Sequence, residues 1–116
     1  MMMKVDLRHM AVAATALIAF AAQAQFVTGN KLLERLDGSN PYERGFGMAY
    51  VLGVADMGFG LNHCPPDTVT AGQVRDLTHQ YLRANPGTRE QSADLLVMRA
   101  LRAVWPCLER GKGSAL

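Results

Sequence analysis

Four stretches of the chain carry apolar residues at helical spacing, and short polar segments with proline or glycine separate them. The last stretch is the most regular, because its apolar positions follow the i, i+3, i+4, i+7 pattern of an amphipathic helix. These positions are Ala93, Leu96, Val97, Ala100, Leu101 and Val104. Pro106 follows and is expected to end the helix. The four stretches together predict an all-α fold, a small four-helix domain.

The first and third stretches begin at residues that cap helices well. Residues 28–38 offer Thr28 or Asn30 as the N-cap, three leucines on one side and Gly38 as a stop. The third helix is expected to begin at Thr70, with Gln73 completing a capping box, and to end at residues 85–87, Asn-Pro-Gly. Its predicted apolar side consists of Val74, Leu77, Tyr81 and Leu82.

The second stretch starts with an N-cap at Asn40 and a proline at the first helical position, followed by Glu43, which is placed to close a capping box. Residues 46–61 then contain a single charged residue, Asp56. A helix that is apolar on every side is expected to be buried on every side. It should therefore lie centrally, or cover one face with a partner chain. Gly53 suggests a close helix approach, whereas glycines 58 and 60 suggest the exit from the helix.

The N-terminus has the layout of a secretory signal peptide. Lys4 and Arg8 precede an apolar run over residues 10–22, which ends in the cleavage pattern Ala22-Gln23-Ala24. The run is too short to span a bilayer. We therefore expect a signal peptide over residues 1–24, cleavage after Ala24 and export. No cysteine follows the cleavage point, so no stable membrane anchor is expected.

The remaining chain fits one small domain over residues 25–107 and a polar tail over 108–116. The formal net charge is +2 for the whole chain. This balance does not favour nucleic acid, which selects a concentrated basic face. The domain is small enough for a covalent crosslink to matter.

The two cysteines, Cys64 and Cys107, are interpreted first as one disulfide, because the protein is expected to be exported. The bond would join the start of the third helix to the end of the fourth if these helices form an antiparallel hairpin. A thiol nucleophile with His63 as its base is a weaker alternative. A metal site made of His63, Cys64, His79 and Cys107 has suitable ligand types without a known ligand spacing, so no metal is expected.

Asp56 raises the question of catalysis, since a carboxylate among apolar neighbours can act as an acid. No second carboxylate is evident nearby, and no phosphate-binding motif is present. A structural hydrogen bond to a tyrosine, a backbone amide or an arginine is favoured over a hydrolase. We expect no enzyme, no catalytic residue and no cofactor. His79 and the surface arginines are expected to be solvated; the arginines are Arg75, Arg83, Arg89, Arg99 and Arg102.

Several motifs together resemble the Rap/Tai-type immunity proteins associated with type VI secretion. They are an export signal followed by GNKLLERL, YVLGVADM, CPPDTVTAGQ, YLRANP and ALRAVWPC. The most specific positions, interpreted as structural, are Tyr50, Gly53, Asp56, Cys64-Pro65 and Pro106-Cys107. None of them identifies a partner-binding surface.

The resemblance implies a small all-α periplasmic protein, dimeric, that binds a peptidoglycan-cleaving amidase or endopeptidase effector and blocks its active site. Relatives often carry a further cysteine pair around the first two helices, where this chain has Arg35 and Arg44 or Gly45.

A periplasmic acid-stress chaperone of the Hde type is the alternative function. Such chaperones are also small, exported, helical and held by one disulfide. An apolar helix hidden in a dimer would be uncovered by dissociation. With two histidines after residue 24, such a switch would depend on aspartate and glutamate titration.

Overall fold

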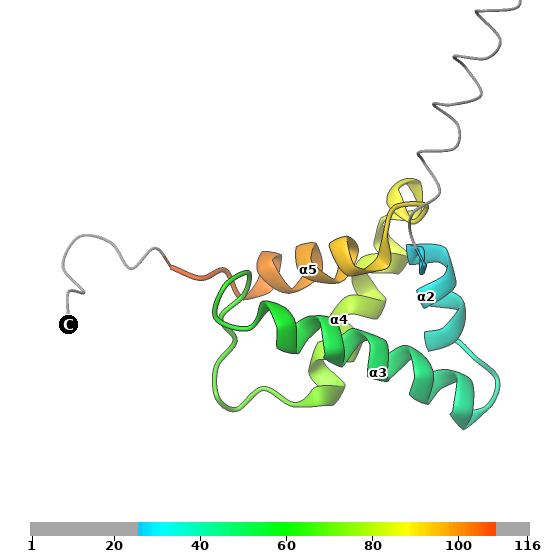
Figure 1. The fold of residues 1–116 in the computed structure, drawn as a ribbon, viewed down its shortest axis with the longest axis horizontal. Coiled ribbons are helices and arrows are strands. Elements are labelled where there is room, and N and C mark those ends of the chain that lie inside the picture. Colours follow the sequence, from blue (N-terminus) through cyan, green and yellow to red (C-terminus); the bar gives the residue numbers. More distant parts are fainter. Residues whose placement is uncertain (1–25, 109–116) are drawn as a thin grey trace, which may run out of the picture.

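Four α-helices and one 3-10 turn make up residues 26–108, the part of the chain that the computed structural model describes (Figure 1). The helices are α2 (Gly29–Leu36), α3 (Pro41–Gly58), α4 (Ala71–Ala84) and α5 (Ala93–Val104), with the turn η1 at Pro86–Thr88. This range contains isolated β-bridges and no strand, which confirms the expected all-α class. The expected signal peptide and the tail from residue 109 lie outside the described residues. None of the helices in the described range has the length and apolar character needed to cross a bilayer.

The helix N-termini are where the local sequence predicted them. The Thr28 side chain accepts a hydrogen bond from the Lys31 amide at 3.2 Å, and Asn40 does the same for the Glu43 amide at 2.9 Å. At α4, the capping box with Gln73 is complete, with bonds of 3.2 and 2.9 Å. Each cap satisfies amide groups that the first helical turn leaves without a partner.

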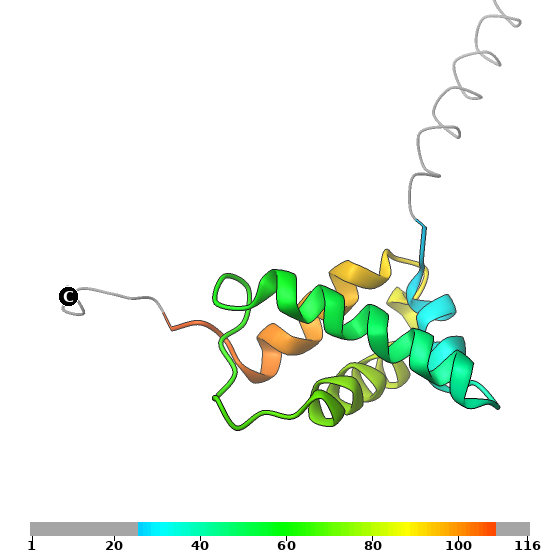
Figure 2. The ribbon, with the colours of Figure 1, turned by 60° about the horizontal axis from the view of Figure 1, so that its bottom comes forward.

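The core forms where the helices meet, and each helix contacts the other three. Figure 2 shows α3 lying across α4 and α5. The buried apolar residues include Leu32, Leu36, Val51, Ala55, Val74, Leu82, Ala93, Leu96, Val97 and Leu101. Five of the six positions predicted for α5 are buried, whereas Val104, at the helix end, is 46% exposed. On α4, Thr78 takes a buried place, its hydroxyl donating to the Val74 carbonyl oxygen at 3.0 Å, whereas Leu77 and Tyr81 are half-buried.

The central position considered for α3 is wrong, because α3 is not buried on every side within this chain; the alternative, coverage of one face by a partner chain, stays a prediction. Only Gly47, Val51, Ala55 and Gly58 are buried on it. Their spacing of three and four residues defines one face of the helix, and the opposite face is exposed. A domain of four short helices has too few elements to enclose a central helix, so apolar residues of α3 remain in contact with water.

An ion pair holds the turn between α2 and α3, where relatives are expected to carry a second cysteine pair. Arg35 Nη1 lies 2.5 Å from Glu43 Oε2, and the Arg35 guanidinium lies 4.9 Å from the Phe46 ring centroid. Arg44 donates to the Gly38 carbonyl oxygen at 2.9 Å. The Glu43 side chain thus bonds Arg35 and does not close the expected capping box. Polar contacts connect these helices without a covalent bond.

The predicted Cys64–Cys107 disulfide is present, with a Cα–Cα distance of 4.8 Å and a separation of 43 residues. Beside it, the Cys64 amide donates to the Trp105 carbonyl oxygen at 2.8 Å. These two bonds connect the segment before α4 with the end of α5. The described residues contain no free cysteine, which excludes the thiol nucleophile in this state of the protein.

Candidate protein-binding surface

An apolar stripe runs along the exposed face of α3. It consists of Tyr42, Phe46, Ala49, Gly53 and Met57, and we call it the α3 stripe. Successive members are three or four residues apart, so they lie on one side of the helix. Tyr42 and Met57 are each 77% exposed and Phe46 is 51% exposed. Contiguous exposed apolar residues of this kind mark surfaces that bind other proteins.

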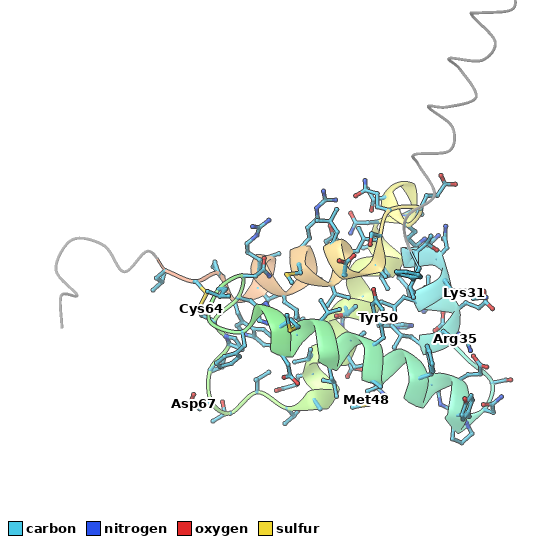
Figure 3. The ribbon with its side chains drawn as sticks, in the orientation of Figure 1. Lys31, Arg35, Met48, Tyr50, Cys64 and Asp67 are labelled. Carbon is cyan, nitrogen blue, oxygen red and sulfur yellow. A yellow bond between two sulfur atoms is a disulfide. The ribbon has the colours of Figure 1, made fainter. Side chains whose placement is uncertain are left out.

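A groove of about 480 Å³ lies beside the stripe, between α3 and α5, and we call it the α3–α5 groove. Its lining is almost wholly apolar and includes Ala49, Gly53, Val54, Met57 and Met98. Tyr50 and Asp94 supply its polar groups. Figure 3 shows Tyr50 on α3 beside α5. The groove extends the exposed apolar surface from α3 onto α5.

Tyr50 remains protonated over the physiological pH range. Burial raises the pKa of its phenol above the ordinary value of 10.0, and the nearby Asp94 carboxylate raises this pKa further. A hydrogen bond with the Asp94 backbone amide lowers the Tyr50 pKa, which partly offsets these two effects. A protonated phenol can donate a hydrogen bond to a partner that fills the groove.

A separate pocket of about 310 Å³ lies on the other flank of α3, and we call it the Trp105 pocket. Residues from α3, from the loop before α4, from α4 and from α5 enclose it. Its apolar walls include Leu52, Phe59, Val69, Val74 and Trp105. Asp56 also lines it.

His63 is a structural residue. It is 2% exposed, and its Nε2 donates to the Ala55 carbonyl oxygen at 2.9 Å, which fixes the ring hydrogen on Nε2 because a carbonyl only accepts. Nδ1 accepts from the Asn62 side-chain amide at 3.0 Å, and that amide also donates to the Met98 carbonyl oxygen at 2.9 Å. Both ring nitrogens are therefore engaged, so His63 has no free nitrogen for a base or a ligand.

The structural hydrogen bond expected of Asp56 is absent. Its side chain is exposed, and within residues 26–108 it makes no hydrogen bond or ion pair. Gly53 likewise shows no close approach to another helix of this chain, since a Cβ built there meets no atom within 4 Å. Two of the motif positions on α3 thus face outward.

The two prolines of the motif flank the disulfide. Pro65 lines the Trp105 pocket. Pro106 lines a further hollow together with Met57 of α3 and Leu61 of the turn that follows α3. Their place beside Cys64 and Cys107 fits the structural interpretation of these positions.

His79 and most of the arginines have partners. His79 Nε2 lies 2.7 Å from Asp37 Oδ1, which connects α4 with the end of α2; the expectation of a merely solvated histidine is wrong. Further pairs are Arg83–Asp37 at 3.8 Å, Arg75–Asp76 at 2.6 Å and Arg99–Gln91 at 2.7 Å. Between residues 26 and 108, no group of three or more His, Cys, Asp or Glu side chains is arranged to hold a metal ion.

The described helical domain coincides with a known family. A family model described as Rap1a immunity proteins matches residues 28–107, from the N-cap of α2 to the second cysteine of the disulfide. The chain belongs to this family. The resemblance inferred from the sequence motifs is confirmed. No curated protein matches the chain.

Membership in the Rap1a immunity proteins gives the chain a general role. Immunity proteins bind a partner effector protein, and such families are typically non-enzymatic. The sequence allowed an apolar face of α3 for a partner chain, but it did not identify which residues form that face. The spacing of Tyr42, Phe46, Gly53 and Met57 was visible, but spacing alone does not say which face of an all-apolar helix meets the core.

Proposed function

We propose that this Rap1a family member is a periplasmic immunity protein that binds and inhibits a peptidoglycan-cleaving effector of a type VI secretion system. The family match over the whole helical domain carries this proposal. The Cys64–Cys107 disulfide supports a location outside the cytoplasm, because such bonds persist in oxidising compartments. The N-terminal sequence supports the same location.

The α3 stripe supports a homodimer as the working form. Ala49 and Gly53 are small and exposed, so a second helix can approach α3 closely there. Phe46 and Met57 lie along the same stripe and would be removed from water by that approach. A two-fold axis through the stripe would bring it against the same stripe of a second copy.

The inhibitory function is tested by protection of cells. A candidate amidase or endopeptidase effector, encoded beside this protein, is expressed in the periplasm of a bacterial host, and lysis is followed by turbidity. We expect lysis to stop when the full chain is co-expressed, and to continue when a chain beginning at Gln25 without an export signal is used. Protection by the unexported chain would contradict the periplasmic site of action. Failure of the exported chain against every neighbouring effector would contradict the inhibitory function.

The homodimer is tested by light scattering after size-exclusion chromatography. Met57→Asp places a charge on the α3 stripe and is expected to give a monomer. Val104→Asp is the matched control, because Val104 is an exposed apolar residue of α5 outside the stripe. A monomeric unsubstituted protein, or equal behaviour of the two variants, would contradict a dimer formed through α3.

A further inference from the structure

The Trp105 pocket has the size and chemistry of a site for one apolar side chain. Its volume of about 310 Å³ lies at the lower end of the range for ligand pockets, about 300–1,000 Å³. Ala55, Val74 and Leu101 are buried and form its base. Phe59, at its rim, is 60% exposed. A group that fills the pocket would therefore cover apolar surface that is now in water.

One carboxylate lines the pocket, and a second lies on the adjoining loop. Asp56 is the only carboxylate among the lining residues. His63 also lines the pocket, but both of its ring nitrogens are engaged in hydrogen bonds within the domain. Asp67 lies on the loop between Pro65 and Val69, two residues that line the pocket, and Figure 3 shows it on the outer side of that loop. In the described range, neither Asp56 nor Asp67 has an ion-pair partner.

The walls of the pocket are fixed before any partner binds. The disulfide and the Cys64–Trp105 backbone bond hold the loop against the end of α5. The hydrogen bond from His63 to Ala55 holds the same loop against α3. The capping box at Thr70 fixes the start of α4, which forms another wall. A preformed pocket loses little conformational freedom on binding, and such pockets hold the anchor residues of protein interfaces.

We propose that the Trp105 pocket binds an apolar side chain of a basic segment on the effector, with a lysine or arginine next to that side chain meeting Asp56. The pocket buries the apolar side chain, and the Asp56 carboxylate, which has no ion-pair partner within residues 26–108, attracts the neighbouring cation. Asp67 adds negative charge on the adjoining loop. Most residues of this pocket lie on the flank of α3 away from the α3–α5 groove, and Asp56 lies next to the α3 stripe, three residues after Gly53. The inference rests on the proposed function, since it assigns the chemistry of the partner.

Trp105 allows a direct test without the effector, because it is the only tryptophan of the chain and lines the pocket. The full-length, oxidised protein is titrated with acetyl-Leu-Arg-Arg-amide, acetyl-Gly-Arg-Arg-amide and acetyl-Leu-Glu-Glu-amide while Trp105 fluorescence is recorded. We expect saturable binding of the first peptide alone, weakened by added salt. Equal binding of the acidic peptide, or of the peptide without leucine, would overturn the proposal.

Two variants and one control locate the binding. Asp56→Asn is expected to weaken binding of acetyl-Leu-Arg-Arg-amide about two- to fivefold, as for an exposed ion pair. Ala71→Trp, at an exposed position that lines the pocket, should fill it and weaken binding about tenfold or more, measured by calorimetry because it adds a tryptophan. Glu34→Gln, on α2, is the matched control and should change nothing. Unchanged binding in both pocket variants would overturn the proposal.

The same measurements distinguish two further outcomes, occupation of the pocket by a second copy of the chain and an immunity function that does not use the pocket. A change of Trp105 emission with protein concentration alone would show that a second copy occupies the pocket, which also overturns the proposal. The proposed function has its own readout, protection from lysis. Protection that survives Asp56→Lys together with Ala71→Trp would reject the pocket as the effector site and leave the immunity function standing.

Discussion

His63 Nε2 donates a hydrogen bond to the carbonyl oxygen of Ala55, eight residues earlier on α3, at 2.9 Å. The Phe59 amide, which would continue the helical ladder to Ala55, bonds the Asp56 carbonyl oxygen instead. The imidazole thus satisfies a carbonyl at the end of α3 that the backbone leaves open. The loop after α3 is thereby held against the helix it leaves.

Replacing this imidazole is expected to be costly. His63→Ala should lower the free energy of unfolding by about 2–4 kcal/mol, because a buried carbonyl loses its donor and a cavity remains. Urea denaturation followed by circular dichroism measures the loss. His79→Ala is the control, since the half-exposed His79–Asp37 pair should be worth about 1 kcal/mol or less. Equal losses in the two variants would show that the His63 bond has no special role.

The disulfide is expected to contribute much of the stability. Closing a loop with a separation of 43 residues is worth about 4 kcal/mol in the chain-entropy model, and a small domain has about 5–15 kcal/mol in total. Reduction, or the double substitution Cys64→Ser and Cys107→Ser, should lower the free energy of unfolding by about 4 kcal/mol. The loss is measured as a lower urea concentration at the unfolding midpoint. A reductant that leaves the midpoint of the unsubstituted protein unchanged would contradict this role.

Two glycines should respond to alanine in opposite directions. A Cβ at Gly29 would contact the Leu96 side chain and lie 2.9 Å from the Arg89 carbonyl oxygen, a backbone atom that moves only with its chain. A Cβ at Gly53 would meet nothing within 4 Å. We expect Gly29→Ala to destabilise the domain by about 1–3 kcal/mol.

Gly53→Ala should stabilise the isolated monomer by about 0.5–1 kcal/mol through helix propensity. Thermal unfolding at low protein concentration compares the two variants. The same Gly53 variant should weaken a dimer formed through the α3 stripe, because the added methyl group separates the two helices. Stabilisation of both monomer and dimer would argue against a helix crossing at Gly53.

Tyr50 should lose its proton above pH 10.0, since burial and then Asp94 raise its pKa. An acid whose pKa is raised by folding contributes stability below its unfolded pKa, and that contribution is lost as pH rises through the folded pKa. The free energy of unfolding should therefore fall above about pH 10. Tyr50→Phe should lessen that fall.

Absorbance at 295 nm measures the phenol titration, and the difference from Tyr50→Phe isolates one of the three tyrosines. Asp94→Asn should lower the Tyr50 pKa, which should stay above the ordinary value because burial remains. An unchanged Tyr50 titration in that variant would exclude an effect of the Asp94 charge.

The sequence predicted the features that depend on near neighbours along the chain. Thr28, Asn40 and Thr70 start helices because each side chain reaches an amide three residues ahead. The face of α5 that meets the core was visible because polar residues mark the other face. Cys64 and Cys107 were paired correctly because a chain with two cysteines has one intramolecular pairing available.

The position of His63 was not predictable, because its ring meets the Ala55 carbonyl oxygen only after the loop has turned back on α3. Asp56 was expected among apolar neighbours with a polar partner. It lies instead at the mouth of a pocket whose other walls come from α4 and α5. Such a pocket forms only when segments that are far apart in the sequence pack together, so no local sequence pattern predicts it.

For this protein, the sequence by itself determined the helices, their caps, the crosslink and the family, since each follows from local hydrogen bonding, periodicity or a short motif. Only the tertiary structure decided which side of α3 is exposed. An all-apolar helix gives no sign of its own orientation, and three neighbouring helices can cover only the face of Val51 and Ala55. Phe46 and Met57 remain on the outside because the domain has no further helix to bury them.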